Sequence, residues 1–171
     1  MLNQLPLGKQ GFVTSEQGIG MMSVGITVGK KDLYGKSNDI TVNGVSALIE
    51  RCVDAGVTHF DTAQAYKNLW SMVVGPWFFL ANSSEQKMKP GLASTKGKWQ
   101  VATKVPPPGA KSHVKEACYQ SCRDLGVECI DLYYLHRIDA KIPIEVTMQA
   151  MKELITERKI KYVGISEASA S

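Results

Sequence analysis

Five short apolar segments alternate along the chain with stretches in which apolar residues recur at helical spacing. The clearest helical stretch is followed by Gly56, which is expected to end it, and its apolar positions at i, i+3, i+4, i+7 and i+8 are Val45, Leu48, Ile49, Cys52 and Val53. The segments that we predict as strands are residues 18–22, 58–61, 100–103, 130–135 and 162–165. Strands that alternate with helices predict a parallel sheet with right-handed crossovers, so the fold class is α/β.

Two further helices follow the third and fourth of these strands. One is expected to begin at Ser112, a suitable N-cap, and to end at Gly126. The other has Pro143 in its first turn, and the residues expected to face its core are Met148, Met151, Leu154 and Ile155.

The remaining segments are less regular. Glycines at positions 8, 11, 18 and 20 predict a short hairpin that leads into the first strand, and residues 23–43 are typical of a polar loop. Residues 67–98 contain an apolar cluster interrupted by Gly75-Pro76 and then a polar stretch with Pro90-Gly91. We interpret 67–98 as an atypical insertion or irregular segment, in which a clean helix is not expected.

Four polar side chains follow the predicted strands. Asp61 ends the second strand and Tyr66 comes five residues later, while Lys104 and His136 end the third and fourth. Taken singly, each has an ordinary structural explanation, such as a turn residue or a solvated charge. Together they lie at the carboxyl ends of parallel strands, where α/β barrels carry their chemistry. A phenol is a weak proton donor unless a nearby cation stabilises the phenolate, and Lys104 is the candidate cation.

Around these residues the chain resembles the aldo-keto reductases. The segments that carry the resemblance are FDTAQAY (60–66), ATK (102–104), LGVECIDLYYLHRID (125–139) and KIKYVGISEAS (159–169), with weaker similarity in LGKQGFVTSEQGIGMM (7–22). The LYYLHRID and ISEAS strings are most similar to the perakine-reductase-like and auxin-induced-protein-like branch. The resemblance implies a partial TIM (β/α)8 barrel of about five strands, because the complete barrel needs about 250 residues.

The resemblance also implies a reaction and a cofactor. Hydride transfer from NADPH would reduce an aldehyde or ketone, with Tyr66 as proton donor, Lys104 as its cationic neighbour and Asp61 holding the ammonium. His136 would orient the carbonyl and stabilise the developing oxyanion. The residues expected to contact NADP(H) are Gly20, Met21, Met22, Asp61, Ser166 and Glu167. A relative normally has Tyr-Gly and then an Asn-Glu pair opening the second helix, and this chain departs from that pattern after Tyr66.

Composition narrows the classes of function. The chain has 171 residues, 44% of them hydrophobic, and a formal net charge of +4, which is too small to predict nucleic-acid binding. No run of 18 apolar residues predicts a membrane span. The cysteines at 52, 118, 122 and 129 lack the spacing of a zinc site, so we expect no metal, buried free thiols and a cytoplasmic location.

The resemblance places the end of the sequence after the fifth barrel strand, and we expect one incomplete barrel domain over 1–171. In the family, the loops that bind the cofactor phosphates follow later strands. An open piece of barrel would leave strand edges exposed, which favours self-association. Two interpretations therefore stay open, an NADP-dependent reductase and a catalytically silent barrel fragment that acts as a binding or regulatory partner.

Overall fold

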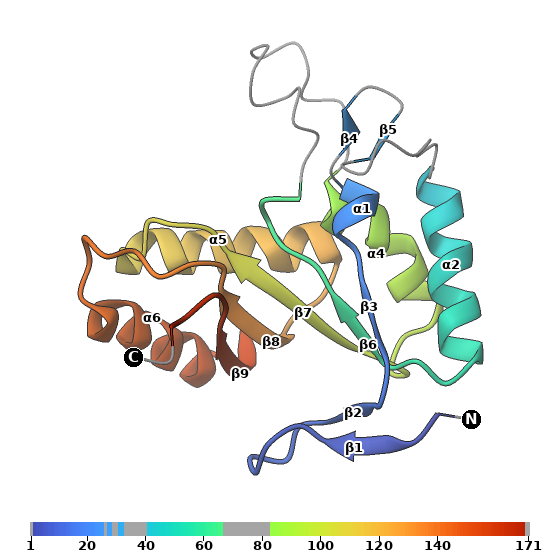
Figure 1. Ribbon diagram of the computed structural model, residues 1–171, viewed down its shortest axis with the longest axis horizontal. Coiled ribbons are helices and arrows are strands. Elements are labelled where there is room, and N and C mark those ends of the chain that lie inside the picture. The colour runs from blue at the N-terminus through green and yellow to red at the C-terminus, as the bar shows by residue number, and fades with distance from the viewer. Residues whose placement is uncertain (1, 26, 29–30, 33–40, 67–82, 170–171) are drawn as a thin grey trace.

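The computed structural model describes residues 2–25, 27–28, 31–32, 41–66 and 83–169. Its centre is a sheet of five parallel strands, in the order β3-β6-β7-β8-β9 (Figure 1). These strands are β3 (Gly18–Gly20), β6 (His59–Asp61), β7 (Gln100–Val105), β8 (Ile130–Leu135) and β9 (Ile160–Ile165). The sheet follows chain order from one edge to the other, as repeated βα units predict. The α/β fold class, the five parallel strands and the alternating helices are confirmed.

Helices connect these strands and pack beside one another. They are α1 (Met22–Gly25), α2 (Val42–Asp54), α4 (Ser84–Ser94), α5 (Lys111–Leu125) and α6 (Ile144–Thr156). Contacts run from α2 to α4, from α4 to α5 and from α5 to α6, so the helices follow the same order as the strands (Figure 1). None of the helices within the described ranges is long and apolar enough to cross a membrane.

Two small antiparallel ladders lie outside the main sheet. The expected hairpin at the N-terminus is formed by β1 (Gln4–Pro6) and β2 (Val13–Ser15). The first barrel strand is shorter than predicted, because the chain turns into α1 after Gly20. The supposed loop at 23–43 includes part of α1, the start of α2 and the pair β4 (Thr27–Val28) and β5 (Lys31–Asp32).

The helix ends show where local signals were sufficient. Gly126 adopts a left-handed φ of 71° at the end of α5, as its position predicted. The Ser112 N-cap was wrong, because α5 begins one residue earlier, and Ala110 occupies the cap position without a side-chain bond. Pro143 is the N-cap residue of α6 and lies just outside its first turn.

The prediction for residues 67–98 was wrong over its second part, while 67–82 lie outside the described residues. Residues 84–94 form α4, and a reciprocal capping box begins this helix. Ser83 Oγ accepts from the Gln86 backbone and Gln86 Oε1 accepts from the Ser83 backbone. The S-x-x-Q spacing is a known sequence signal for a helix start. The Pro90-Gly91 pair obscured this signal, but Pro90 is accommodated within the helix and Gly91 is buried against α2.

Gly91 allows α4 to pack closely against α2. A Cβ at this position would lie 2.9 Å from the Ser46 Cα and 3.1 Å from the Ile49 Cβ. We expect Gly91→Ala to lower the free energy of unfolding by about 1–2 kcal/mol, because the crowded atoms include backbone and overpacking outweighs the gain in helix propensity. Urea unfolding followed by circular dichroism measures the loss. Ala93→Ser, an exposed change on the same helix, is the control, and equal stability of Gly91→Ala and the parent chain would contradict this account.

The sheet has two different faces. Between the sheet and the helices lies the main core, which includes Phe60, Val101 and Tyr133 from the strands and Met88, Leu92, Val114, Met151 and Leu154 from the helices. The opposite face carries a smaller cluster of Phe12, Ala102 and Leu132, with Tyr134 and Tyr162 packed against it. Alternate strand residues therefore point away from the helices. On α6, the prediction that Ile155 faces the core was wrong, because this side chain is 44% exposed.

Candidate active site

The carboxyl ends of the parallel strands are held side by side by backbone hydrogen bonds beyond the regular ladder. Thr62 N donates to Ala102 O at 2.8 Å, His136 N donates to Val105 O at 2.9 Å, and Ser166 N donates to Leu135 O at 2.9 Å. The residues that follow β6, β8 and β9 therefore lie at one edge of the sheet. This is the edge at which the sequence predicted the chemistry.

Lys104 and Asp61 form an ion pair at this edge. The Lys104 ammonium contacts Asp61 Oδ1 and donates to the Thr62 carbonyl oxygen at 2.9 Å. The Lys104 side chain is 10% exposed and that of Asp61 is 29% exposed. Because the amine is almost fully buried, these two oxygen partners determine where its charge lies.

Tyr66 is brought to the same place by a turn after β6. Its backbone N donates to Ala63 O at 3.0 Å, and its carbonyl oxygen accepts from Ser84 N at 2.9 Å. The Tyr66 ring is buried, and its centroid lies 5.4 Å from Lys104 Nζ. The His136 ring packs edge-on at a centroid distance of 5.7 Å. All four predicted catalytic residues are thus brought together, although Tyr66 and Lys104 are 38 positions apart in the sequence.

His136 lies in surroundings that favour its neutral form. Burial lowers the pKa of His136 below its usual 6.5, and the nearby Lys104 charge lowers it further. The imidazole is therefore neutral at neutral pH. A neutral imidazole can donate one hydrogen bond to a carbonyl oxygen through its protonated ring nitrogen.

The residues predicted to contact a cofactor lie at both ends of this edge. Gly20 is exposed, and no atom of the described residues lies within 4 Å of the position of a Cβ. Met21 N donates to Asp61 O at 2.8 Å, but the Met21 side chain is fully buried in the core. Met22, the next residue, opens α1 and is half-buried. At the other end, Ser166 is half-buried, and the exposed Glu167 pairs with Arg137 at 2.9 Å.

Two residues near the site were missed by sequence reasoning. Ser84 links three parts of the site: its backbone N donates to Tyr66 O, its hydroxyl donates to Met21 O at 2.9 Å, and the same oxygen accepts from the Thr62 hydroxyl. Tyr134 lies opposite Lys104 in the sheet, and its ring centroid is 5.5 Å from Lys104 Nζ. Strand alternation could have identified Tyr134, whereas Ser84 became visible only when α4 was recognised as a helix.

The cysteines and the other two histidines lie apart from this group of four residues. All four cysteines are free thiols, and two of them, Cys118 and Cys122, are buried on α5. In the described ranges no three His, Cys, Asp or Glu side chains are grouped as metal ligands. The Nε2 atom of His113 lies 3.1 Å from Pro106 O, and the His59 ring packs edge-on against Phe12.

His59 should make folding sensitive to acid. Burial lowers the pKa of His59 below its usual 6.5, and the opposing attraction of Asp61 and Asp131 is smaller. Because the unfolded chain binds this proton more readily, stability is full above about pH 6.5 and falls as the pH drops toward the folded pKa. We expect His59→Gln to lose less stability than the parent chain between about pH 7.5 and pH 5.5. Urea unfolding at both pH values tests this, and parallel losses would contradict the assignment.

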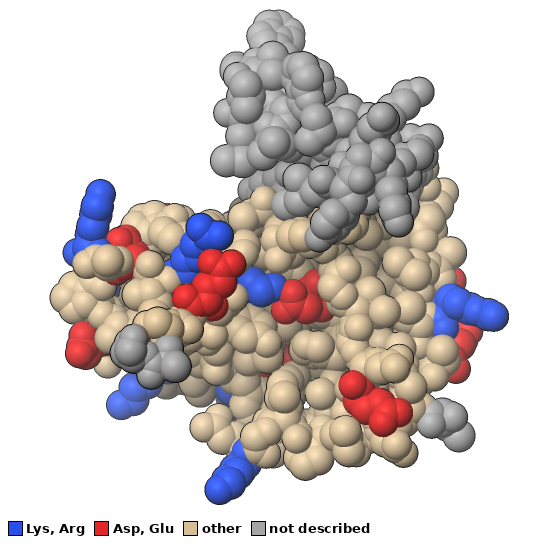
Figure 2. All heavy atoms as spheres, in the orientation of Figure 1, with Lys and Arg blue, Asp and Glu red and all other residues tan. Residues whose placement is uncertain are grey.

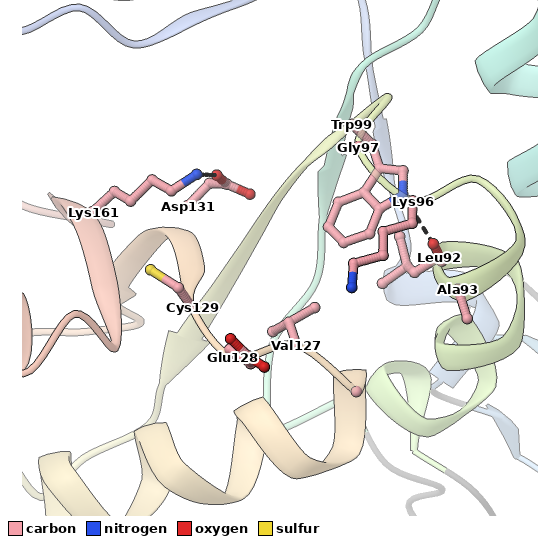
Figure 3. A pocket seen from close by; sticks show the side chains of 11 residues that line it. Leu92, Ala93, Lys96, Gly97, Trp99, Val127, Glu128, Cys129, Asp131 and Lys161 are labelled. Atoms are coloured by element: carbon pink, nitrogen blue, oxygen red, sulfur yellow. Dashed lines mark hydrogen bonds and ion pairs between the residues drawn. The ribbon is translucent and has the colours of Figure 1, made fainter.

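A separate cavity lies at the other end of the sheet. It has a volume of about 420 Å³, and Figure 3 shows Trp99, Val127 and Leu92 around it, with Lys161 and Asp131 paired at 2.6 Å on one side. The Trp99 ring is held by its hydrogen bond to Leu92 O at 3.0 Å. None of the predicted catalytic residues lines this cavity, and the amino ends of barrel strands ordinarily serve stability.

Comparison with known proteins identifies the family. Residues 18–171 match the sequence profile of the Aldo/keto reductase family. This chain belongs to the aldo/keto reductase family. The match includes Asp61, Tyr66, Lys104 and His136 and extends over most of the sequence.

Solved aldo-keto reductases have the same arrangement of strands and helices. An aldo-keto reductase from Bacillus halodurans in its holo form is 26% identical with a TM-score of 0.75, covering 97% of this chain and 50% of its own. An aldo/keto reductase from Klebsiella pneumoniae in complex with NADP and acetate is 23% identical with a TM-score of 0.72. The alignment covers 92% of this chain and 47% of the Klebsiella protein. The thermostable aldo-keto reductase Tm1743 in complex with the inhibitor epalrestat is 20% identical with a TM-score of 0.78. The alignment covers 99% of this chain and 55% of Tm1743. The chain therefore spans about half the length of these relatives.

Proposed function

We propose that this chain is an NADP-dependent aldo-keto reductase that reduces an aldehyde or ketone, with Tyr66 as the proton donor. The observation that carries this proposal is the meeting of Tyr66, Lys104 and His136 at the carboxyl edge of the sheet. Family membership supports the reaction class. The charges across the face shown in Figure 2 are mixed in sign. This face therefore has no single-sign field that would steer a charged cofactor toward the site.

Each of the four side chains has a distinct part in proton transfer. Asp61 and the Thr62 carbonyl hold the Lys104 ammonium beside the Tyr66 ring. That positive charge stabilises the phenolate left behind when Tyr66 gives its proton to the carbonyl oxygen. The neutral His136 donates a hydrogen bond to the same oxygen as negative charge develops there.

The edge of the sheet also suits a nicotinamide. At the β9 end, Ser166 and Glu167 offer a hydroxyl donor and a carboxylate acceptor for a carboxamide, and at the β3 end the exposed Gly20 would let another part of the cofactor approach the backbone. When bound, NADPH would supply the hydride. Met22 would border the cofactor at the β3 end, whereas Met21 would contribute its backbone, because its side chain lies in the core.

The branch of the family is a further part of this proposal. The LYYLHRID (132–139) and ISEAS (165–169) segments favour the perakine-reductase-like and auxin-induced-protein-like branch. The alternative of a catalytically silent binding partner is not favoured by the family match or by NADP in the Klebsiella relative.

Fluorescence titration with NADPH, followed by turnover of an aromatic aldehyde, tests the proposed function. We expect saturable quenching and consumption of NADPH that depends on the aldehyde. NADH at the same concentrations tests the cofactor preference. Soluble, cooperatively folding chain that neither binds NADPH nor turns over the aldehyde would overturn the proposal.

A further inference from the structure

A row of three residues crosses the sheet on the face away from the helices. Lys104 of β7 is the register partner of Tyr134 of β8, and Tyr134 is the register partner of Gly164 of β9. Residues opposite one another on neighbouring strands point to the same face. Tyr134 therefore lies between Lys104 and Gly164 in this row of the sheet.

The Lys104 ammonium lies close to two aromatic rings. Its Nζ is 5.4 Å from the Tyr66 centroid and 5.5 Å from the Tyr134 centroid. Both distances are within the range in which an aromatic face attracts a cation. Asp61 and the Thr62 carbonyl oxygen bind the same amine. The surroundings of the ammonium therefore include two oxygen partners and two aromatic rings, one of them Tyr134.

Gly164 provides the space in which the Tyr134 ring lies. A Cβ on residue 164 would be 2.3 Å from Tyr134 Cδ1 and 2.4 Å from Tyr134 Cε1, closer than real side chains approach. Gly164 has no positive φ, so the reason for glycine here is space and not backbone conformation. Any larger residue at 164 would push the ring away from its present place beside Lys104.

We infer that Tyr134 is a positioning residue for the reaction, which holds the Lys104 ammonium against Tyr66, and that Gly164 acts through it. Without the Tyr134 ring, Lys104 would border the cavity of about 370 Å³ that Tyr134, Leu132, Tyr162 and Gly164 line. Water entering from that side would weaken the influence of the ammonium on the phenolate. The expected effect on kinetics rests on the proposed function. The placement of Lys104 by Tyr134 rests only on the contacts described above.

Kinetics of a small set of variants test the consequence. We expect Tyr134→Leu and Gly164→Ala each to lower kcat by about fivefold to tenfold, the equivalent of one lost cation–π contact, with little change in KM for NADPH. Tyr134→Phe keeps the ring and should keep most of the activity.

Two controls separate this role from a general effect on folding. Tyr162→Leu removes a ring of the same size from the same face, and that ring packs against Phe12 at 5.0 Å and not against Lys104. We expect its kcat to match that of the parent chain. The double variant Tyr134→Leu/Gly164→Ala should be no slower than Tyr134→Leu, because Gly164 acts only through the ring. A double variant that multiplies the two losses, or a Tyr134→Leu variant that keeps the kcat of the parent chain, would overturn the inference.

A second readout does not depend on turnover. In chain labelled with ¹³C-lysine, the Lys104 ε-methylene, identified by its disappearance in Lys104→Arg, should show the chemical shift of a group shielded by two rings. Tyr134→Phe should keep that shift, whereas Tyr134→Leu and Gly164→Ala should move it toward the exposed-lysine value. An unchanged shift in Tyr134→Leu overturns the inference whatever the activity. A changed shift in a chain without any turnover supports the placement and refutes the proposed function.

Discussion

Tyr66→Phe should lower kcat for aldehyde reduction by about 10²–10⁴-fold, the usual contribution of a positioned general acid. The phenylalanine ring keeps the packing against His136 and Lys104, so only the proton is lost. We expect NADPH affinity and thermal stability to stay close to those of the parent chain. Stopped-flow fluorescence of NADPH oxidation measures the rate with bound cofactor, and equilibrium titration measures the affinity.

Tyr119→Phe is the matched control for Tyr66→Phe. It removes the hydroxyl of the half-buried Tyr119 on α5, which donates to Glu157 at 2.6 Å. Its kcat should equal that of the parent chain. If Tyr66→Phe retains more than about a tenth of kcat, Tyr66 is not the proton donor. Tyr134, the other phenol beside Lys104, would then be the residue to test.

Among the single substitutions considered, Asp61→Asn should lower stability most, by about 3 kcal/mol in the free energy of unfolding. The change leaves the Lys104 ammonium buried with the Thr62 carbonyl and a neutral amide in place of its counter-charge. The expected loss is at the lower end of the range for buried pairs, because Asp61 is 29% exposed and water can partly replace the carboxylate. Urea unfolding followed by circular dichroism at neutral pH measures the loss.

The double variant Asp61→Asn/Lys104→Met identifies the cause. Removing the unpaired charge should recover much of the lost stability, although activity should stay low because the cation is gone. Lys111→Met, which removes a surface partner of Glu153, should leave the midpoint of unfolding nearly unchanged. A double variant less stable than Asp61→Asn would show that packing, and not the unpaired charge, explains the loss.

Local signals predicted much of this fold because they act over a few residues. Gly126 ends α5 in a left-handed conformation, as predicted, and the helix buries Val114, Ala117 and Leu125. The bounds of β8 agree with the prediction, and the other strands are offset by a few residues at their ends. The helix at 84–94 was missed because Pro90-Gly91 resembles a loop signal. That pair lies within α4 because Gly91 fits closely against α2, a contact that local sequence does not show.

By itself, the sequence indicated the family through its resembling segments and predicted Asp61, Tyr66, Lys104 and His136 as site residues, because each ends or follows a recognisable strand. Only the tertiary structure showed Asp61 and Tyr66 beside the Lys104 ammonium, and Tyr134 and Gly164 in the same row of the sheet. The physical reason is strand register. A sequence shows which residues alternate along one strand, but the pairing of Lys104 with Tyr134 and of Tyr134 with Gly164 depends on how three separate strands align.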